Sequence, residues 1–226
     1  MLALSRAGDD IDFLSLLSVG NRRRFLERST QRVYPAGALV WHPDSPPKTL
    51  LIDRGLVRAY TYVPDGRQAT VGFRHAKELV GGTMVVSHPP RILAQVVAES
   101  TLTTLDMETI RILASTEIEV VGAVAAQLSA RLRQGARLIA VRTLGNIRER
   151  LAYDLLERAT RSQLAVGRLD VRATHTELAN SIGSSREVVS RALSSLRSVG
   201  IVDTAPGLVR VKDPIRLAGI VEAFDF

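Results

Sequence analysis

Residues 174–199, THTELANSIGSSREVVSRALSSLRSV, predict two short amphipathic helices that meet at the single glycine of this stretch. Thr174 is followed three residues later by Glu177, the pattern of a capping box at a helix N-terminus. Ser184 and Glu187 repeat that pattern directly after the glycine. The stretch therefore predicts a helix-turn-helix, an arrangement whose second helix commonly enters the major groove of DNA.

The second predicted helix separates its apolar from its polar residues. At about 100° per residue, the apolar side chains fill an arc of roughly 140° and the polar side chains fall outside it. A polar face is also expected of any surface helix in a bundle, so a role as packing scaffold stays open as an alternative. The polar residues of the first two turns lie where a recognition helix contacts bases. The candidate DNA-binding residues are Arg186, Glu187, Ser190 and Arg191, with Ser185 and Thr174 beside the two helix starts.

The sequence after the helix pair predicts a β-hairpin. Two β-rich segments, residues 201–204 and 208–212, flank the turn-forming Ala205-Pro206-Gly207. Residues 169–171 form a further strand candidate that can pair with this hairpin. A hairpin in this position is the wing of a winged helix, and it favours DNA binding over the scaffold interpretation.

Composition limits the possible functions. The 226 residues suffice for two domains, and the 0 Cys exclude disulfides, a cysteine nucleophile and cysteine-ligated metal centres. No apolar run approaches the ~20 residues of a membrane span and the start lacks a signal peptide, so we expect a cytoplasmic protein without membrane contact. The net charge of +7 suits a polyanionic partner, but it is spread over the chain and supports nucleic-acid binding only weakly.

The first half of the chain has the pattern of an antiparallel β-barrel or sandwich. Two short helices are expected within Asp9–Arg28, interrupted at Val19-Gly20-Asn21. From about Gln31 to Asp106, short β-rich runs alternate with turns that contain Gly or Pro. One of the expected turns is Asp53-Arg54-Gly55.

A long helix is expected to follow, starting near Glu117. Its mainly apolar residues recur alternately every four and three positions and so form a heptad seam. Such a seam favours a homodimer, in which two copies of the helix pair, over a helix that packs only on its own barrel. Leu144-Gly145 ends this helix, and Asn146 with Glu149 caps the next one, which places a hinge there. The seam residues are Val121, Ala125, Leu128, Leu132, Gly135, Ile139 and Arg142.

Taken in this order, the elements and residues resemble the CRP/FNR family of bacterial transcription regulators over nearly the whole chain. The strongest segment, residues 182–193 (IGSSREVVSRAL), is similar to the recognition-helix motif of the family. Gly37, Gly55 and the run Glu78-Leu79-Val80-Gly81 look like its barrel pattern. The resemblance implies an α+β chain with a cyclic-nucleotide-binding-like β-roll (jelly roll) over residues 1–114, a dimerisation helix and hinge over 115–144, and a winged helix-turn-helix over 145–226.

The function that the resemblance implies is that of a dimeric regulator of transcription that binds double-stranded DNA and contacts RNA polymerase. It implies that Arg186, Glu187 and Arg191 contact base edges, which suits the pairing of arginine with guanine and of glutamate with cytosine. Val188 replaces the threonine of the cyclic-AMP-binding members, which puts one contact in doubt. An enzyme is not expected, because the sequence has no phosphate-cradling loop, metal-ligand cluster or nucleophile motif.

The barrel departs from the family at the positions where cyclic-AMP-binding members hold their ligand. Gly82 replaces the ribose-binding glutamate that follows Gly81, and Ile92-Leu93 replaces the phosphate-binding Arg-Ser pair. Gly135-Ala136 replaces the hydroxyl-bearing position near the base. Because an unpartnered buried phosphate costs several kcal/mol, we expect an apolar pocket that does not bind cyclic AMP. The candidate pocket residues are Gly81, Gly82, Ile92, Leu93, Gly135 and Ala136.

No cofactor is expected, and the effector stays open. Haem is the alternative with a chemical basis, because His42, His75 and His88 lie in the barrel half and some family members sense gases through haem. No spacing singles out an axial ligand. An apolar or organic effector, no effector, and an interaction module whose helix-turn-helix does not bind DNA are the remaining alternatives.

Overall fold

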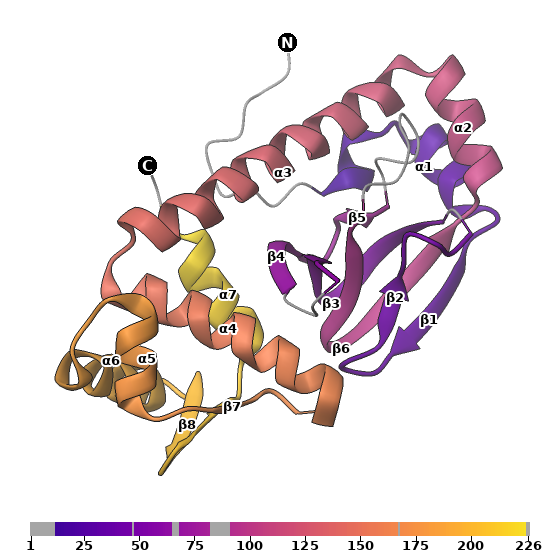
Figure 1. The fold of residues 1–226 in the computed structure, drawn as a ribbon. Helices are drawn as coiled ribbons and strands as arrows, with labels where there is room; N and C mark the ends of the chain where they lie inside the picture. Colours follow the sequence, from indigo (N-terminus) through magenta and orange to yellow (C-terminus); the bar gives the residue numbers. More distant parts are fainter. Residues whose placement is uncertain (1–11, 47, 65–67, 82–90, 167, 225–226) are drawn as a thin grey trace.

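The computed structural model describes residues 12–46, 48–64, 68–81, 91–166 and 168–224. A β-domain and a smaller helical domain are joined by one long helix that runs diagonally along the molecule (Figure 1). Gly82 and His88, two residues of the pocket and haem hypotheses, lie outside the described residues.

The N-terminal domain is built on an antiparallel sheet with the order β1-β6-β3-β4, in which β2 also pairs with β6 and β5 with β3. This confirms the predicted β-roll. The strands are β1 (Thr30–Tyr34), β2 (Leu39–Trp41), β3 (Thr49–Tyr62), β4 (Gln68–Arg74), β5 (Leu79–Val80) and β6 (Leu93–Leu105).

The turn expected at Asp53-Arg54-Gly55 is wrong, because β3 continues through it. The register against β6 shifts between Ile52 and Leu56, so the strand bulges instead of turning. Gly55 has a φ of 114° there, which favours glycine. The Ser100 hydroxyl of β6 accepts a hydrogen bond of 3.2 Å from the Leu56 amide. A partner 44 residues away thus replaces the local turn.

Three helical segments cover one end of the sheet: η1 (Phe13–Leu16), α1 (Val19–Leu26) and α2 (Met107–Thr116). The interruption expected at Val19-Gly20-Asn21 is wrong, because α1 begins at Val19. Ser18 caps it, with its hydroxyl accepting from the Asn21 amide. Helix α2 is not among the predicted elements; Asp106 caps it by accepting from the Thr109 amide at 2.9 Å.

The long helix α3 (Ile118–Leu144) ends where the sequence predicted, and the next helix, α4 (Ile147–Val166), begins directly after Asn146. The predicted cap is confirmed: the Asn146 amide donates to the Glu149 carboxylate at 2.8 Å, and the Glu149 amide donates to the Asn146 side chain at 3.1 Å. Within the described ranges, no single helix has the length and apolarity of a membrane span, and only α2 with α3, bent by 108°, meets that test as a pair.

One face of α3 packs on the β-roll. The buried residues of the helix are Val120, Ala123, Val124, Gln127, Ala130, Gln134, Leu138 and Val141. The predicted heptad seam lies mainly on the other side, where Leu132 is 77% exposed and Ile139 is 69% exposed. A single chain therefore leaves large apolar side chains of this helix in contact with solvent.

The C-terminal domain contains β7 (Asp170–Arg172), α5 (His175–Ile182), α6 (Arg186–Ser198), β8 (Val202–Ala205), β9 (Leu208–Val211) and α7 (Pro214–Glu222). Its sheet has the order β7-β9-β8. This confirms the wing hairpin and its pairing with the strand before the helix pair. Helix α7 is not among the predicted elements, although Asp213 caps it and Pro214 occupies its first turn.

Helix α4 lies between the two domains, below α3 in the view of Figure 1. Leu56, Phe73 and Val97 of the β-roll belong to the same apolar cluster as the core of the winged helix. Gln163 of α4 also donates a hydrogen bond of 2.7 Å to the Val97 carbonyl of β6. The β-roll and the winged-helix half therefore share one core, to which α4 contributes.

Candidate nucleic-acid interface

The first helix of the predicted pair is fixed by its capping box. The Thr174 hydroxyl accepts from the Glu177 amide at 3.2 Å, and the Glu177 carboxylate accepts from the Thr174 amide at 2.7 Å. The hydrogen bond from the Thr174 amide lowers the pKa of Glu177. The helix ends at Gly183, whose φ of 63° is the left-handed conformation common at helix C-termini. The predicted start and end of α5 are thus both confirmed.

The second capping box is wrong by one residue. Ser185, not Ser184, caps α6, because its hydroxyl accepts from the Val188 amide at 3.4 Å. The Ser184 amide is already bonded to the Ala179 carbonyl at 2.9 Å, as part of the turn that closes α5. Hydrogen bonding to a backbone amide and to Ser185 lowers the pKa of Glu187.

The recognition-helix candidates occupy one side of α6. Arg186, Glu187 and Arg191 are exposed, as are Ser185 and Thr174, whereas Ser190 is half-buried. The opposite side of the helix is buried through Val189, Leu193 and Leu196. The polar and apolar sides therefore separate as the sequence predicted.

His175 is a residue of the site that the sequence analysis missed. Its Nδ1 lies 2.7 Å from the Ser190 hydroxyl, so α5 and α6 are joined by a polar contact on the side that carries the candidates. Nothing in the local pattern identifies this pair, because the two residues are 15 positions apart.

A cleft of about 470 Å³ lies between the start of α5 and the wing. Arginine, hydroxyl groups and backbone amides are the groups that bind DNA phosphates. This cleft offers such groups beside the exposed start of α6. It is lined by Thr174, His175, Thr176, Arg186 and the wing residues 204–207.

The described candidates for the effector pocket differ in their burial. Gly81 follows β5 with a φ of 83°, and Leu93 is buried at the start of β6, next to the half-buried Ile92. On α3, Ala136 is exposed and a Cβ added to Gly135 would meet nothing within 4 Å among the described residues. Two α3 side chains reach the sheet: Arg131 donates to the Leu79 carbonyl of β5, and the Oε1 of Gln134 would lie 2.7 Å from a Cβ at Gly72.

The interior of the β-roll next to α3 contains buried polar and charged side chains. Arg74 and Glu78 are buried in the sheet domain next to α3, where Arg74 donates to the Gln134 side chain. Burial lowers the pKa of Arg131 to about 10, and burial raises the pKa of Glu78. Opposite charges from strands and helix compensate one another here, which makes a polar interior possible.

Two histidines of the haem hypothesis, His75 and His42, have carboxylate partners. His75 Nε2 lies 2.9 Å from the Glu222 carboxylate of α7, and His42 Nδ1 lies 3.5 Å from that of Asp44. Over the part of the chain that the structure describes, no group of three or more His, Asp or Glu residues is arranged to hold a metal ion.

A β-roll linked by a long helix to a winged helix-turn-helix defines a class of DNA-binding transcription regulators. Residues 31–117 match the cyclic nucleotide-binding domain family, and residues 149–220 match the Crp-like helix-turn-helix domain family. The chain is 30% identical over 192 residues to the cyclic AMP receptor protein of Thermus thermophilus, covering 84% of this chain and 87% of that protein. The chain belongs to the CRP/FNR family of transcription regulators, and its helix-turn-helix domain binds DNA.

Other relatives agree with this assignment. The CRP-like protein Clp of Xanthomonas euvesicatoria is 27% identical over 198 residues, covering 82% of this chain and 85% of that protein. A crp/fnr-family regulator from Eubacterium rectale has the same fold, with a TM-score of 0.59 and 18% identity over 94% of this chain and 99% of that one. The c-di-GMP-responsive regulator CLP of Xanthomonas campestris has a TM-score of 0.53 and 24% identity over 86% and 99%.

Proposed function

We propose that the chain is a dimeric, sequence-specific transcription regulator and not an enzyme, with α6 as its recognition helix. Arg186, Glu187 and Arg191 contact base edges, and Ser185, Ser190 and Thr174 contact the DNA backbone or hold these residues in place. The observation that supports this proposal is the exposure of three charged side chains on one side of a helix whose other side is buried. Such a helix places donors and acceptors in the major groove without disturbing the core.

The dimer forms through the exposed seam of α3. Leu132, Ile139 and Val121 are large apolar side chains on the seam that the β-roll leaves uncovered. Pairing two copies along this helix removes them from water and brings two recognition helices to half-sites about one DNA turn, ~34 Å, apart. The chain then divides into the sheet domain (1–114), the dimerisation helix and hinge (115–144) and the DNA-binding domain (145–226).

The β-roll does not bind cyclic AMP in this proposal. Neither Gly135 nor Ala136 offers a side-chain hydrogen bond to a base, and the buried interior already holds Arg74 and Glu78 in a network with α3. A phosphate buried without the charged and hydroxyl partners that the candidate pocket positions lack would cost several kcal/mol. Micromolar affinity for cyclic AMP in calorimetry would overturn this part. Contact with RNA polymerase and control by another effector are further parts of the proposal.

Selection of bound DNA from a random pool tests the sequence specificity. The purified chain should enrich a two-fold symmetric site. Arg191→Ala should weaken binding to that site by about 1–3 kcal/mol while affecting random DNA much less. Arg197→Ala, at the far end of the same helix, is the matched control and should keep the preference. Equal losses on both DNAs for Arg191→Ala would mean that this side chain contacts only phosphate.

A further inference from the structure

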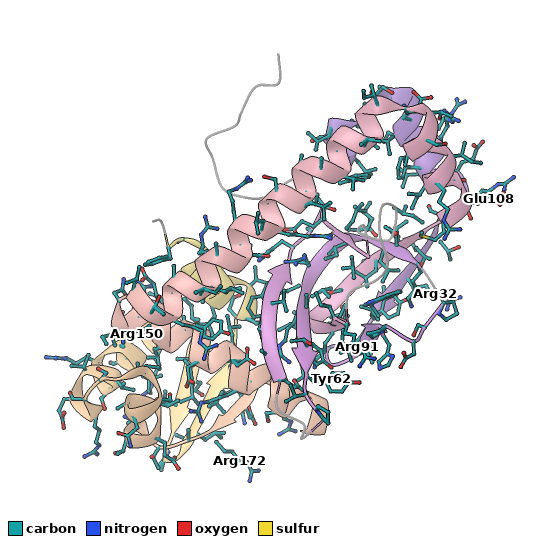
Figure 2. All side chains as sticks on the ribbon, turned by 45° about the horizontal axis from the view of Figure 1, so that its top comes forward. Arg32, Tyr62, Arg91, Glu108, Arg150 and Arg172 are labelled. Atoms are coloured by element: carbon teal, nitrogen blue, oxygen red, sulfur yellow. The ribbon has the colours of Figure 1, made fainter. Side chains whose placement is uncertain are left out.

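The last helix of the winged-helix domain reaches back to the β-roll. Helix α7 (Pro214–Glu222) lies between α3 and α4 (Figure 1), and Figure 2 shows it next to α3 from a second direction. Its apolar residues Leu217, Ala218 and Val221 are 0% exposed and belong to the apolar cluster to which α4 also contributes. The body of α7 is therefore held by apolar packing, and its C-terminal end meets polar groups of other elements.

Glu222, at the C-terminal end of α7, bridges the β-roll and the long helix. Its Oε1 lies 2.9 Å from Nε2 of His75, the residue that follows β4. The same oxygen accepts a hydrogen bond of 2.9 Å from Nε2 of Gln134 in α3. The side chains of His75 and Glu222 are 17% and 20% exposed, so salt screens their interaction only partly. One carboxylate thus joins the winged-helix domain, the β-roll and α3.

A neighbouring contact holds the residues that follow α7. Nε of Arg137 donates a hydrogen bond of 2.8 Å to the Phe224 carbonyl. Arg137 lies three positions after Gln134, so both bonds come from one side of α3. Because an arginine stays protonated in proteins, this contact does not change with pH near neutrality. The contact between His75 and Glu222 differs in this respect.

The β-roll side of that contact is fixed by its backbone. The His75 carbonyl accepts a hydrogen bond of 3.3 Å from the Glu78 amide. The Lys77 amide donates one of 2.6 Å to the Ile52 carbonyl of β3, and the Lys77 side chain forms an ion pair of 3.1 Å with Asp12. The turn that carries His75 is thus tied to the sheet, and α7 is the partner that can move.

Charged groups face His75 from the sheet domain, from α3 and from α7. Burial raises the pKa of Glu78, and the charges of Arg74, His75 and Arg131 act against that rise. Burial lowers the pKa of Arg74, and Glu78 and Glu222 act against that fall. Coulomb attraction is strongest at contact distance, and Glu222 is in contact with the imidazole. The surroundings therefore favour a protonated His75 when α7 is in place.

We propose that His75 and Glu222 form a pH-sensitive latch between α7 and the β-roll. A histidine changes its charge between about pH 5 and 8, where a glutamate is largely ionised. Protonated His75 gives a charge-assisted hydrogen bond, whereas the neutral imidazole can keep a hydrogen bond but loses the ionic attraction. The latch is complete below about pH 6.5, where an unfolded histidine is protonated, and is lost as the pH rises to where the paired histidine releases its proton.

The latch restricts the movement of the winged helix relative to α3. Because the proposed dimer pairs two α3 helices, an attached α7 gives each recognition helix a fixed position relative to the other copy. Loosening it raises the conformational entropy that is lost when both half-sites are bound, so specific DNA affinity falls. This effect on DNA rests on the proposed function, whereas the response of α7 to pH does not.

Hydrogen–deuterium exchange of the full-length protein at about pH 6 and about pH 8 tests the latch. After correction for the intrinsic pH dependence of exchange, the amides of α7 should lose protection about three- to tenfold between the two values. Glu222→Gln and His75→Asn should each show the lower protection at both. His42→Asn is the matched control, because His42 also lies near a carboxylate, 3.5 Å from that of Asp44, but follows β2. It should behave like the unchanged protein.

Equal protection of α7 at both pH values in the unchanged protein would overturn the proposal, as would a pH response that Glu222→Gln retains. Side-chain NMR of His75 gives a measurement that does not depend on the opening of α7. The imidazole should titrate at a higher pH in the unchanged protein than in Glu222→Gln, and equal midpoints would refute the latch. His75→Asn gives the exchange test if Glu222→Gln does not fold.

Fluorescence anisotropy with the selected DNA separates the latch from the proposed function. Between about pH 6 and 8, affinity should fall more for the unchanged protein than for Glu222→Gln. If α7 loosens as expected and both affinities change equally, the control of DNA binding by the latch is wrong. If Arg191→Ala failed to alter base preference, the proposed recognition residues would be wrong while the response of α7 to pH stayed as measured.

Discussion

The Arg58 guanidinium of β3 donates a hydrogen bond of 2.9 Å to the Glu157 carboxylate of α4, and the arginine is 0% exposed. Its Nε also donates to the Thr70 hydroxyl at 2.8 Å, and the Thr70 hydroxyl in turn contacts Glu157. The guanidinium lies 4.5 Å from the centre of the Tyr60 ring. A charge of the β-roll is therefore neutralised by a helix of the DNA-binding half, so the position of α4 determines whether this charge has a partner.

Removing the carboxylate should destabilise the protein strongly. Glu157→Ala leaves a buried guanidinium without its counter-charge, and we expect the free energy of unfolding to fall by about 3–5 kcal/mol in denaturant titrations. Asp154→Ala is the control, because its ion pair with Arg158 is partly exposed and should contribute about 1 kcal/mol or less. Replacing both partners, by Arg58→Met with Glu157→Leu, should recover much of the loss. Equal losses for the two single variants would contradict a special role of the buried pair.

Charged substitutions on the α3 seam should disrupt the proposed dimer. A carboxylate at an apolar contact between two copies of the helix would be desolvated next to its symmetry mate. Leu132→Glu and Ile139→Glu should therefore each give a monomer in light scattering at concentrations where the unchanged chain is a dimer. Ile112→Glu alters an apolar residue of α2 that is 49% exposed, and it should leave the dimer intact. A monomeric unchanged protein at micromolar concentration would refute the dimer itself.

The sequence predicted best where structure depends on nearby residues. The Thr174 capping box, the Asn146 cap and the wing hairpin follow from residues within a few positions of one another, and all three are confirmed. The first turn of α6 was placed one residue early, because Ser184 and Ser185 are both good caps and only the turn after α5 decides between them. Periodicity also identified the exposed residues of the recognition helix, although their contacts with DNA stay a prediction.

The sequence failed where a distant partner decides the outcome. Nothing near Gly55 shows that Ser100 bonds the following amide, so the local sequence predicts a turn where the strand has a bulge. The polar interior could not be predicted either, since Arg58 meets a carboxylate 99 positions away and Arg74 meets a side chain 60 positions away. Which side chains meet across such separations depends on the tertiary fold, and the pattern of neighbouring residues carries no information about it.

The capping box of α5 predicts a dependence of stability on pH. Glu177 has a pKa lowered from the usual 4.5 by its bond from the Thr174 amide, so its folded form binds a proton less readily than its unfolded form. Its contribution is present above the unfolded pKa and is lost as the pH falls through the lower folded pKa. The unchanged protein should therefore be more stable than Glu177→Gln at neutral pH, with the difference shrinking below about pH 4.5 in denaturant titrations. A difference that stays constant down to pH 3 would contradict this assignment.

Alanine substitutions at two glycines with positive φ distinguish the cost of backbone strain from the cost of a steric collision. Gly55 and Gly207 have φ values of 114° and 69°, so alanine is strained at both. A Cβ at Gly55 would lie 2.8 Å from the Ser100 Cα and 2.1 Å from its hydroxyl, whereas one at Gly207 meets nothing within 4 Å among the described residues. Gly207→Ala should lower the free energy of unfolding by about 1 kcal/mol, from backbone strain alone.

Gly55→Ala should cost at least about 2 kcal/mol more than Gly207→Ala, because β3 and β6 must separate to admit the methyl group. Ser100→Gly in the Gly55→Ala background should restore only part of the loss, since the backbone contact remains and the bond to the Leu56 amide is removed. Thermal unfolding followed by circular dichroism measures all four proteins. Similar losses at the two glycines would mean that the sheet absorbs the methyl group, and that the bulge at Gly55 is set by its φ alone.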